Sequence, residues 1–518
     1  MGLPASGKTT VGQAVADELG LGWCDTDALV EQRTGRLVRE IFADEGEERF
    51  RELEQEAVAH ALAHYDVVCL GGGSVMTPAV RQMLDGHSVV WLDVSVVTLT
   101  RRAGMSTLRP LLLGDLRARL GELAGQRLPV YELVATWRID ADRPVRDIVR
   151  DVVDLIQGVR VIRVAAENPY DVLIGPGVSA RVGSLLASAE PAVAKTAVLY
   201  PPVLADRVAK LAADWPDPVL IEVPEAEQAK TVDTLDRCWR TLAEAGLTRS
   251  DAVVGVGGGT TTDLAGFVAA TYLRGISYVS IPTTVLAMAD AAVGGKTGIN
   301  LPQGKNLVGS FYEPRLVTCD LDLLAGLGDH EVRSGLAEIV KCGFISDPDI
   351  LDTVIREPKR VCDVTSAPFA DILARAIQVK ADVVSGDLRE AAVSSVGRAA
   401  LNYGHTLGHA IEKLENFTWS HGYAISVGMV FVAEVAHRLG MVGDDVVDTH
   451  RRVLTSLGLP TEYNGAWADV RATMSIDKKA RGSHLRLILL EDIGRTAVVA
   501  DVDEPILAQS FQAIQGVV

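Results

Sequence analysis

The sequence predicts an α/β protein in which two successive sheet domains precede a mainly helical part. Over residues 1–157, short apolar runs such as 67–70 alternate with helical stretches, as the strands and crossover helices of a parallel sheet do. The same alternation returns over residues 158–325. Over residues 326–518 the apolar pattern lengthens to helical periods, with one late strand at 485–490. We therefore expect three domains with these boundaries.

Composition limits the partners of the chain. A length of 518 residues gives room for about three domains of ordinary size. The formal charge of −18 repels nucleic-acid phosphates and anionic lipid, so we expect neither as a partner. The six cysteines form no Cys-x-x-Cys pair, which indicates reduced thiols. The sequence shows no leader and no run of 18 apolar residues, so we expect a cytoplasmic protein.

A phosphate-binding motif opens the chain. Residues 2–9 fit the pattern G-x-x-x-x-G-K-[ST], in which backbone N–H groups cradle phosphates, Lys neutralises them and the hydroxyl holds Mg²⁺. A chance Gly-rich helix start is the alternative interpretation. The motif predicts a P-loop kinase type of sheet domain that binds ATP with Mg²⁺, through Gly2, Gly7, Lys8, Thr9 and Thr10.

Two carboxylates follow the next strand-like segment. Asp25 and Asp27 stand at its carboxyl end, where open α/β sheets bind ligands. One carboxylate would serve Mg²⁺ and the other a substrate hydroxyl. Taken alone, an acidic surface turn explains the pair equally well.

Three arginines and a glycine turn extend this candidate site. Arg51, Arg109 and Arg127 lie on either side of a Gly-Gly-Gly turn at 71–73. Arginine forks bind carboxylates bidentately or stabilise a transferring phosphoryl group, although each arginine alone is typical of a surface. Together with the phosphate loop, these features resemble the shikimate kinase family across residues 1–157.

This resemblance implies a role for each residue. Lys8 and Arg109 would contact phosphates, and Thr9 with Asp25 would hold Mg²⁺. The implied shikimate contacts are Asp27, Arg51, Gly72, Gly73 and Arg127. The family has an apolar strand before its phosphate loop, whereas only Met1 precedes Gly2 here. We therefore expect a truncated start, with a damaged kinase half as the alternative, and weak phosphorylation by the sequence as it stands.

The second part of the chain contains several Gly-rich loops. Residues 254–263 form a strand that runs into a Gly-Gly-Gly turn and a helix, which suits a pyrophosphate in a Rossmann-like domain. Loops at 282–284, 294–300 and 304–306 add Gly with Lys or Thr beside Asp290. Ordinary turns explain any one of them, but the cluster predicts a phosphate-rich ligand.

Histidines in the helical part predict a metal site. His405 and His409 stand four residues apart on one helix face, and His421 follows. Glu338 lies on an earlier predicted helix. Two or three imidazoles with one carboxylate suit a catalytic zinc site. The spacing leaves open which two histidines ligate, and unrelated histidines are the alternative.

Motifs run throughout residues 160–505. They lie at 257–267, 274–275, 282–284, 294–298, 338–341, 402–409, 421–422 and 477–479. Together they resemble the 3-dehydroquinate synthase family. The resemblance implies that Glu338, His405 and His421 hold Zn²⁺ or Co²⁺ and leave His409 to the substrate. The implied NAD contacts are Glu227, Lys230, Gly258, Gly259, Asp263, Thr283, Thr284 and Lys305.

The resemblance also implies a reaction that consumes no NAD. NAD oxidises a ring hydroxyl of 3-deoxy-arabino-heptulosonate 7-phosphate, phosphate is eliminated, the hydride returns, and the opened ring closes to 3-dehydroquinate. The implied phosphate contacts are Lys296, Asn306, Asn402, His409 and Arg274. Arg398 and Lys380 would bind the carboxylate. The pocket is completed by Asp290, Lys341 and one of Lys478 and Lys479.

Other functions compete with this one. A polyol dehydrogenase with NAD and a metal would share the layout but release NADH. The first part would then be a nucleotide-binding regulatory module without chemistry. The Gly-Gly-Lys-Thr-Gly loop and the many basic residues favour a two-headed enzyme with small-molecule substrates, and we expect a homodimer formed through the synthase half.

Overall fold

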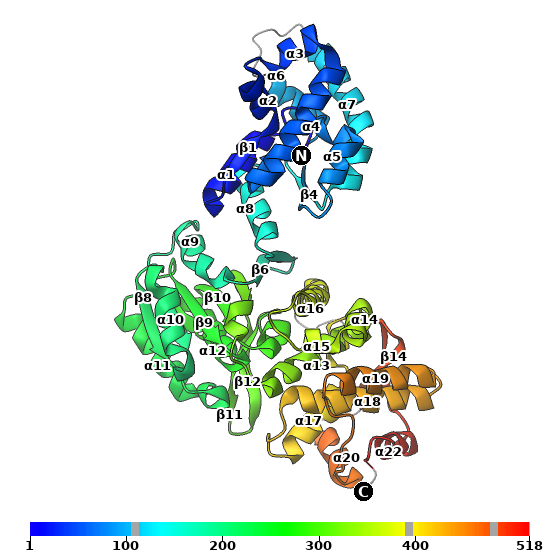
Figure 1. Cartoon of the computed structure of the whole chain (residues 1–518). Helices are drawn as coiled ribbons and strands as arrows, with labels where there is room; N and C mark the ends of the chain where they lie inside the picture. The colour runs from blue at the N-terminus through cyan, green and yellow to red at the C-terminus, as the bar shows by residue number, and fades with distance from the viewer. Residues whose placement is uncertain (105–112, 389–396, 477–484, 517–518) are drawn as a thin grey trace. The chain divides into compact units, whose positions relative to one another are not determined.

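The chain divides into two units with separate hydrophobic cores. They are Met1–Gly158 and Val159–Val518, drawn in Figure 1. The computed structural model describes residues 1–104, 113–388, 397–476 and 485–516.

Two pairs of parallel strands form the sheet part of the first unit. β1 pairs with β2, and β3 pairs with β4. Met1 adds one residue beside β3, because its amino group donates to Val90 O at 2.6 Å and its carbonyl accepts from Leu92 N at 2.9 Å. Among the described residues no strand joins the two pairs. The strands are β1 Trp23–Asp25, β2 Val67–Cys69, β3 Val90–Asp93 and β4 Trp137–Asp140.

Helices cover these strands on an apolar core. Val11 and Val15 of α1, Val152 of α8 and Trp91 of β3 are buried in it. A smaller cluster around Phe50 lies between α2, α3 and α4. The helices are α1 Lys8–Leu19, α2 Thr26–Thr34, α3 Val38–Asp44, α4 Gly46–His64, α5 Pro78–Met83, α6 Val96–Gly104, α7 Leu113–Val134 and α8 Val145–Ile156.

A seven-stranded sheet is the centre of the second unit. Its order is β5-β6-β13-β10-β9-β7-β8, and all neighbours are parallel except β5 and β6. The inner strands are buried along almost their whole length, as expected for a sheet covered on both faces, whereas the edge strands β5 and β8 are largely exposed or half-buried. They are β5 Arg160–Val164, β6 Tyr170–Gly175, β7 Thr196–Tyr200, β8 Pro218–Glu222, β9 Ala252–Gly257, β10 Ser277–Pro282 and β13 Leu316–Asp320.

Helices lie against the two faces of this sheet (Figure 1). Val253 of β9 faces α11 and α12, whereas Val254 faces α9 and α10, because successive side chains of a strand point to opposite faces. The helices are α9 Val182–Ala187, α10 Ala205–Leu211, α11 Val232–Glu244 and α12 Gly259–Thr271. The sheet thus has helices on both faces, and this confirms the predicted α/β class.

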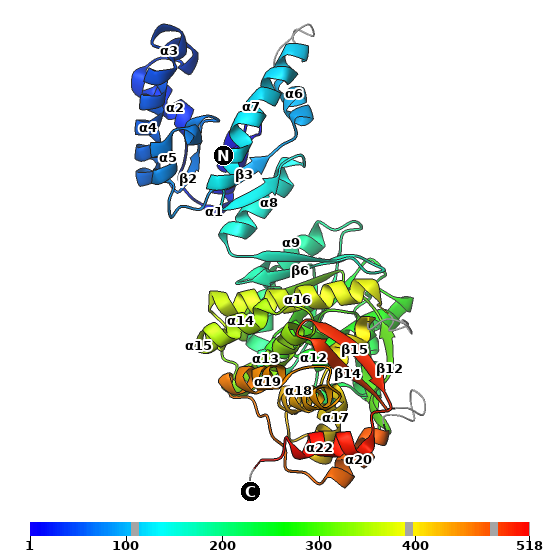
Figure 2. The same cartoon turned by 90° about the vertical axis from the view of Figure 1, so that its right-hand side faces the viewer.

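Two hairpins differ from the sequence-based expectation. The Gly-Lys loops expected at 294–306 belong largely to a two-stranded sheet of β11 (Lys296–Leu301) and β12 (Gly304–Phe311). The single late strand expected at 485–490 is half of a hairpin of β14 (Arg486–Asp492) and β15 (Arg495–Ala500), so the expectation of one strand is wrong. β14 contacts α18, as Figure 2 shows.

The last third is mainly helical, as predicted. Its central helix, α18, is buried along most of its length, since residues 424–436 contact α13, α17, α19 and α22. In the described ranges no helix is long and apolar enough to cross a membrane. The helices are α13 Asp329–Ile345, α14 Asp349–Arg356, α15 Pro358–Val361, α16 Ala367–Gly386, α17 His405–Leu414, α18 His421–Arg438, α19 Asp444–Ser456, α20 Trp467–Ile476 and α22 Glu504–Gln512.

Candidate active sites

The phosphate loop leaves the N-terminus of α1 able to bind an anion. Gly7 precedes the helix with φ 90°, and no side chain caps the first turn, so the backbone N–H groups there are open to a ligand. Thr9 Oγ1 donates to Asp25 Oδ2 at 2.6 Å. Burial lowers the pKa of Lys8, although Asp27 and Asp25 oppose this. The structure therefore brings together the two side chains predicted to hold Mg²⁺.

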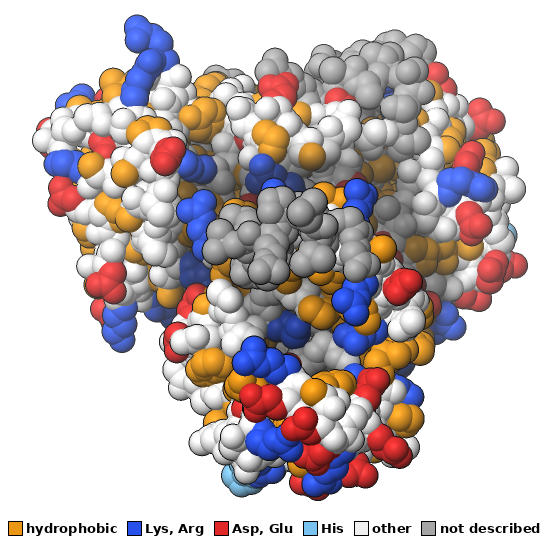
Figure 3. Space-filling view, turned by 90° about the horizontal axis from the view of Figure 1, so that it is seen from above, with side chains coloured by type: hydrophobic (Ala, Val, Ile, Leu, Met, Phe, Trp, Pro, Cys, Tyr) orange, Lys and Arg blue, Asp and Glu red, His pale blue; other side chains and the backbone are white. Residues whose placement is uncertain are grey.

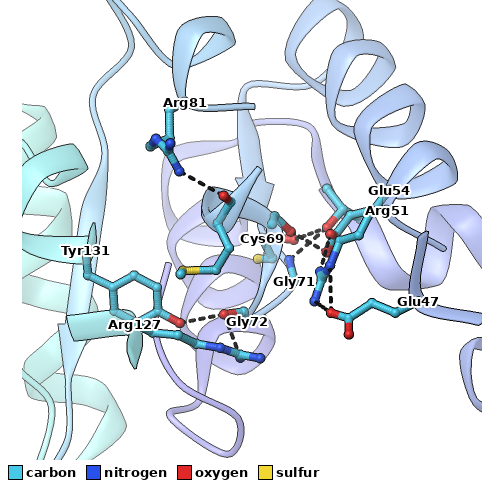
Figure 4. A network of polar contacts seen from close by, with 12 residues as sticks. Glu47, Arg51, Glu54, Cys69, Gly71, Gly72, Arg81, Arg127 and Tyr131 are labelled. Atoms are coloured by element: carbon cyan, nitrogen blue, oxygen red, sulfur yellow. Dashed lines mark hydrogen bonds and ion pairs between the residues drawn. The ribbon is translucent and has the colours of Figure 1, made fainter. Parts of the chain in front are cut away.

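Three predicted shikimate contacts, Arg51, Gly72 and Arg127, meet at the glycine turn after β2 (Figure 4). A methyl group on Gly71 would lie 2.6 Å from Asp27 Oδ1, and one on Gly73 would lie 2.5 Å from the Arg51 guanidinium. Arg127 donates to Gly72 O at 2.8 Å. The absence of side chains at this turn thus leaves room for two cations and one carboxylate at a single place.

Two residues to which the sequence analysis gave no role fix these cations. Glu54 is buried and accepts from Arg51 at 2.6 Å and from Ser74 Oγ at 2.5 Å. Tyr131 donates to the same Gly72 carbonyl as Arg127, at 2.6 Å. Glu54 lies three residues after Arg51 and Tyr131 four after Arg127. Because residues at these spacings share a helix face, the spacing was the available signal.

Electrostatics distinguish the two aspartates of the first site. Burial, with Asp25 and Glu54 nearby, raises the pKa of Asp27 to about 6. A carboxylate of this kind can accept a proton from a bound hydroxyl near neutral pH. Thr10 lies exposed on α1. The predicted phosphate contact Arg109 lies outside the described residues.

The second site begins where β9 and β10 end side by side. Gly258 precedes α12, and no side chain caps that helix. Pro282 of β10 pairs in register with Gly257 of β9, and Thr283 N donates to Gly257 O at 2.9 Å. Thr284 lies next to Gly258. The predicted cofactor turn and the Pro-Thr-Thr loop therefore form one edge that suits a dinucleotide pyrophosphate.

Two polar networks connect this edge to the β11–β12 hairpin. Lys230 is buried and donates to Asp263 Oδ2 at 2.5 Å and to Asn306 Oδ1. Burial raises the pKa of Asp263 to about 6, although Lys230 opposes this. Glu227 accepts from Lys305 at 2.9 Å and from Asn300, a residue that the sequence did not single out. Four of the predicted cofactor residues thus occupy two neighbouring clusters.

The predicted metal ligands come from three helices. Glu338 lies on α13, while His405 and His421 open α17 and α18. Their ligand atoms lie within 4.8 Å of one another. The helix starts meet because Gly422 packs against the backbone of Ser334, where a methyl group would overlap its carbonyl.

The chemistry of this set fits a divalent cation. Glu338 Oε1 is buried without a hydrogen-bond partner, and the Nε2 atoms of His405 and His421 lie 3.8 and 3.6 Å from it. Burial alone would lower the pKa of His421, but Glu338 and Glu412 raise it to about 10. Two nitrogens and one carboxylate oxygen are the ligand set of many open zinc sites.

A buried row of charges borders the metal ligands. Lys341 pairs with Glu338, and Lys380 pairs with Asp290 on the π-helix Ala287–Ala291. Although burial opposes it, the two lysines hold the pKa of Asp290 well below its usual range. The ammonium of Lys380, predicted to bind a substrate carboxylate, is therefore engaged by an internal one.

The remaining predicted residues fall into two groups. His409 is exposed one turn after His405, with ring centroids 5.2 Å apart, and Asn402 lies just before α17. Lys296 is exposed at the start of β11. Arg398 is buried and donates to the carbonyls of Leu388 and Gly294. Lys478 and Lys479 lie outside the described residues.

Arg274 is not brought to the others within this chain. It is exposed in the turn between α12 and β10. That turn precedes β10, whereas the cofactor edge follows it, so Arg274 lies at the opposite edge of the parallel sheet. Leu273 and Arg274 have φ values of 49° and 66°, a strained conformation for residues other than glycine.

Comparisons with known proteins agree with this division. The shikimate kinase family model matches residues 4–157, and the N- and C-terminal models of 3-dehydroquinate synthase match 220–334 and 335–480. The 3-dehydroquinate synthase of Cutibacterium acnes is 51% identical over 360 residues, 68% of this chain and 98% of that protein. That of Leifsonia xyli is 50% identical over 357 residues, again 68% and 98%.

Solved structures show the same fold in the second unit. A 2-deoxy-scyllo-inosose synthase complexed with carbaglucose-6-phosphate, NAD⁺ and Co²⁺ is 25% identical, with a TM-score of 0.62 over 68% of this chain and all of that one. A 2-epi-5-epi-valiolone synthase from Streptomyces hygroscopicus with NAD⁺ and Zn²⁺ bound is 24% identical, with a TM-score of 0.60 over 67% and 96%. The chain belongs to the 3-dehydroquinate synthase family and carries a shikimate kinase domain ahead of the synthase.

Proposed function

We propose that the chain performs two steps of aromatic biosynthesis. The second unit converts 3-deoxy-arabino-heptulosonate 7-phosphate to 3-dehydroquinate and phosphate with NAD and Zn²⁺ or Co²⁺, and the first unit phosphorylates shikimate with ATP and Mg²⁺. The observation that carries the synthase is the buried Glu338 Oε1, which has no partner although two imidazole nitrogens face it. Relatives at half identity over almost their whole length bear the name of this enzyme.

In the second unit the chain binds and orients the substrate. When bound, the metal ion polarises a substrate hydroxyl and NAD accepts and returns a hydride. The buried ammonium groups of Lys341 and Lys380 pair with Glu338 and Asp290 and hold these carboxylates in place at the base of the site. The exposed ends of Lys296 and His409 are placed to bind the departing phosphate. An ammonium or imidazolium there stabilises the leaving dianion and supplies its proton.

In the first unit the chain fixes shikimate between cations and one base. Arg51 and Arg127 bind its carboxylate, since guanidinium groups form bidentate pairs with carboxylates. Asp27, with its raised pKa, accepts the proton of the attacking hydroxyl. Lys8 and the uncapped start of α1 stabilise charge on the transferring phosphoryl group.

One experiment separates the synthase from a polyol dehydrogenase. The full chain is given the heptulosonate phosphate and NAD⁺ at a small fraction of the substrate concentration. Phosphate release over many turnovers, without growth of the NADH absorbance, is expected because the hydride returns to the product. NADH that accumulates in proportion to turnover would move the chain to the dehydrogenase class.

The net charge of the chain favours small molecules as its partners. Acidic and basic side chains are interspersed over the face shown in Figure 3, and the net charge is −18, which favours small-molecule substrates over nucleic acid or anionic membranes.

All six cysteines are free thiols, which supports a reducing compartment such as the cytoplasm. We expect a homodimer formed through the second unit, and light scattering of the full chain tests it.

A further inference from the structure

Carboxylates face both nitrogens of one metal-ligating histidine. Nε2 of His421 lies 3.6 Å from Glu338 Oε1, and Nδ1 lies 3.2 Å from Glu412 Oε2. Glu412 lies on α17, whereas His421 is the first residue of α18. Both side chains are largely buried, with 23% of His421 and 14% of Glu412 exposed. The contact therefore links two helices directly behind the proposed metal site.

The second histidine ligand has the same arrangement. Nδ1 of His405 lies 3.1 Å from the carbonyl oxygen of Tyr403, and its Nε2 faces Glu338. A neutral imidazole that donates its Nδ1 proton keeps its lone pair on Nε2. Each histidine thus has an oxygen acceptor behind it and the orphaned Glu338 oxygen in front of it.

We propose that Glu412 is the positioning residue of the metal site, holding His421 so that the Nε2 lone pair points at the ion beside Glu338. The proposal rests on the metal site assigned above. Metal-ligating histidines generally donate their other N–H to an oxygen acceptor, which fixes the tautomer and the ring direction. A carboxylate acceptor also makes the imidazole a stronger electron donor than a carbonyl does, so His421 is the firmer of the two nitrogen ligands.

The alternative interpretation is that Glu412 itself binds the metal ion. The ligand atoms of His409, Glu412 and His421 also lie within 4.8 Å of one another. Two observations favour positioning. Glu412 Oε2 is already within hydrogen-bond distance of His421 Nδ1, whereas Glu338 Oε1 has no partner. His409 is exposed, whereas Glu338 is buried and His405 and His421 are half-buried.

Two substitutions of the full chain separate charge from hydrogen bonding. Glu412→Gln keeps an oxygen that accepts the Nδ1 proton and loses the charge, whereas Glu412→Met keeps the length and loses the acceptor. Glu415→Gln is the matched control, because Glu415 is a nearby carboxylate that accepts from Tyr463 Oη at 2.7 Å instead. Thermal unfolding in the presence of a chelator shows whether each variant folds.

Co²⁺ binding to the metal-free chain is measured by chelator competition and by the visible absorption of the bound ion. We expect Glu412→Met to weaken Co²⁺ binding about 10- to 100-fold and to shift the absorption bands. Glu412→Gln should weaken it less and keep the band positions, and Glu415→Gln should match the native chain. This graded order is specific to a hydrogen bond at Nδ1.

Three results would overturn the inference in distinguishable ways. Equal Co²⁺ affinity and identical spectra in all variants would show that Glu412 does not position His421. A second equivalent of Co²⁺ that the native chain binds and Glu412→Gln loses would make Glu412 a ligand. A native chain that binds no Co²⁺ would remove the proposed metal site itself.

Discussion

Single buried polar groups decide the geometry of both sites. Glu54 is 1% exposed and Glu338 2%; Glu54 holds Arg51 on its own helix, and Glu338 faces two histidines from other helices. A buried charge that loses its partner costs several kcal/mol. Side chains of this kind are therefore the most sensitive places to test the assignments.

The first prediction concerns Glu54 in the kinase unit. In the native chain Glu54 Oε2 lies 2.6 Å from Arg51 Nη1. Glu54→Gln removes the negative charge of this ion pair. The guanidinium that should bind the shikimate carboxylate is then held less firmly. We expect KM for shikimate to rise about tenfold or more, the equivalent of a lost charge-assisted hydrogen bond of about 1.5–3 kcal/mol, with KM for ATP unchanged. Steady-state kinetics measure both.

A neighbouring glutamate provides the control for this change. Glu52 lies on the same helix, pairs with Arg49 and is 59% exposed, so Glu52→Gln should alter neither constant. A Glu54→Gln chain with native KM for shikimate would show that Arg51 does not depend on Glu54.

The second prediction concerns His450, a buried histidine that is not among the predicted site residues. Its Nε2 forms a hydrogen bond with Tyr403 Oη at 2.9 Å. Its ring stacks on that of Phe344. Burial lowers its pKa from 6.5 to about 4, so the folded state favours the neutral ring. Its contribution to stability is complete above pH 6.5 and is lost as pH falls toward 4.

Urea unfolding of the metal-free chain tests this pH dependence. Between pH 7 and pH 5 the second unit should lose about 2 kcal/mol through His450, and His450→Gln should remove that part of the slope. As a control, His450→Gln and the native chain should have nearly the same slope between pH 7 and pH 8, where the ring of His450 is neutral in both states. An unchanged slope in His450→Gln would contradict the prediction.

The sequence specified most site residues by type but not all by position. His405 and His409 share a helix face, so spacing could not choose between them; the structure places His405 against Glu338 and leaves His409 exposed. Glu412 carried no motif, because its partner His421 is on another helix. Arg274 was grouped with the phosphate contacts by its motif alone, and only the parallel pairing of β9 and β10 shows that it lies opposite the cofactor edge.

At the scale of elements, the metal site depends on how two helix starts approach α13. Gly422 donates its N–H to Ser334 Oγ at 3.1 Å, and Gly408 of α17 lies against Ala424 and Ile425 of α18. Small residues let the helices approach closely enough to present His405 and His421 to the same carboxylate. The helix contacts, and not the loops between them, therefore set the ligand geometry.

The third prediction tests this approach. In Gly422→Ala the added methyl group would overlap the Ser334 carbonyl, so α18 must move away from α13. We expect a loss of about 1–3 kcal/mol in the stability of the second unit and weaker Co²⁺ binding, since His421 is the adjoining residue. Gly386→Ala is the control, because no atom lies within 4 Å of its added methyl group; equal Co²⁺ binding by both variants would contradict the account.

Element boundaries were predictable where the chain is buried on both faces. β9 and β10 are buried along almost their whole length, whereas β15 contains apolar residues but is exposed or half-buried throughout. β11 and β12 contain Gly and Lys, residues that are rare in strands, so the sequence indicated loops. Their pairing comes from contacts with α12 that no local pattern records.

At the scale of the whole molecule, two cores support two chemistries. The core of the first unit contains Val11, Trp91 and Val152, and the largest core of the second surrounds α13 and α18. Within the described ranges of the chain, neither core includes residues of the other unit. The fusion of two enzymes therefore requires no shared packing for either site.

The last prediction follows from these separate cores. Thermal unfolding of the full chain should show two transitions, since each unit loses its own core. ATP with Mg²⁺ should raise one transition and NAD⁺ the other, because a ligand present at 100 times its Kd stabilises the unit that binds it by about 2.7 kcal/mol. His421→Ala should lower Co²⁺ binding and abolish phosphate release, yet leave the ATP-sensitive transition and shikimate phosphorylation unchanged. A single transition that both ligands raise together would show that the units unfold as one, and loss of kinase activity in His421→Ala would show that the sites are coupled.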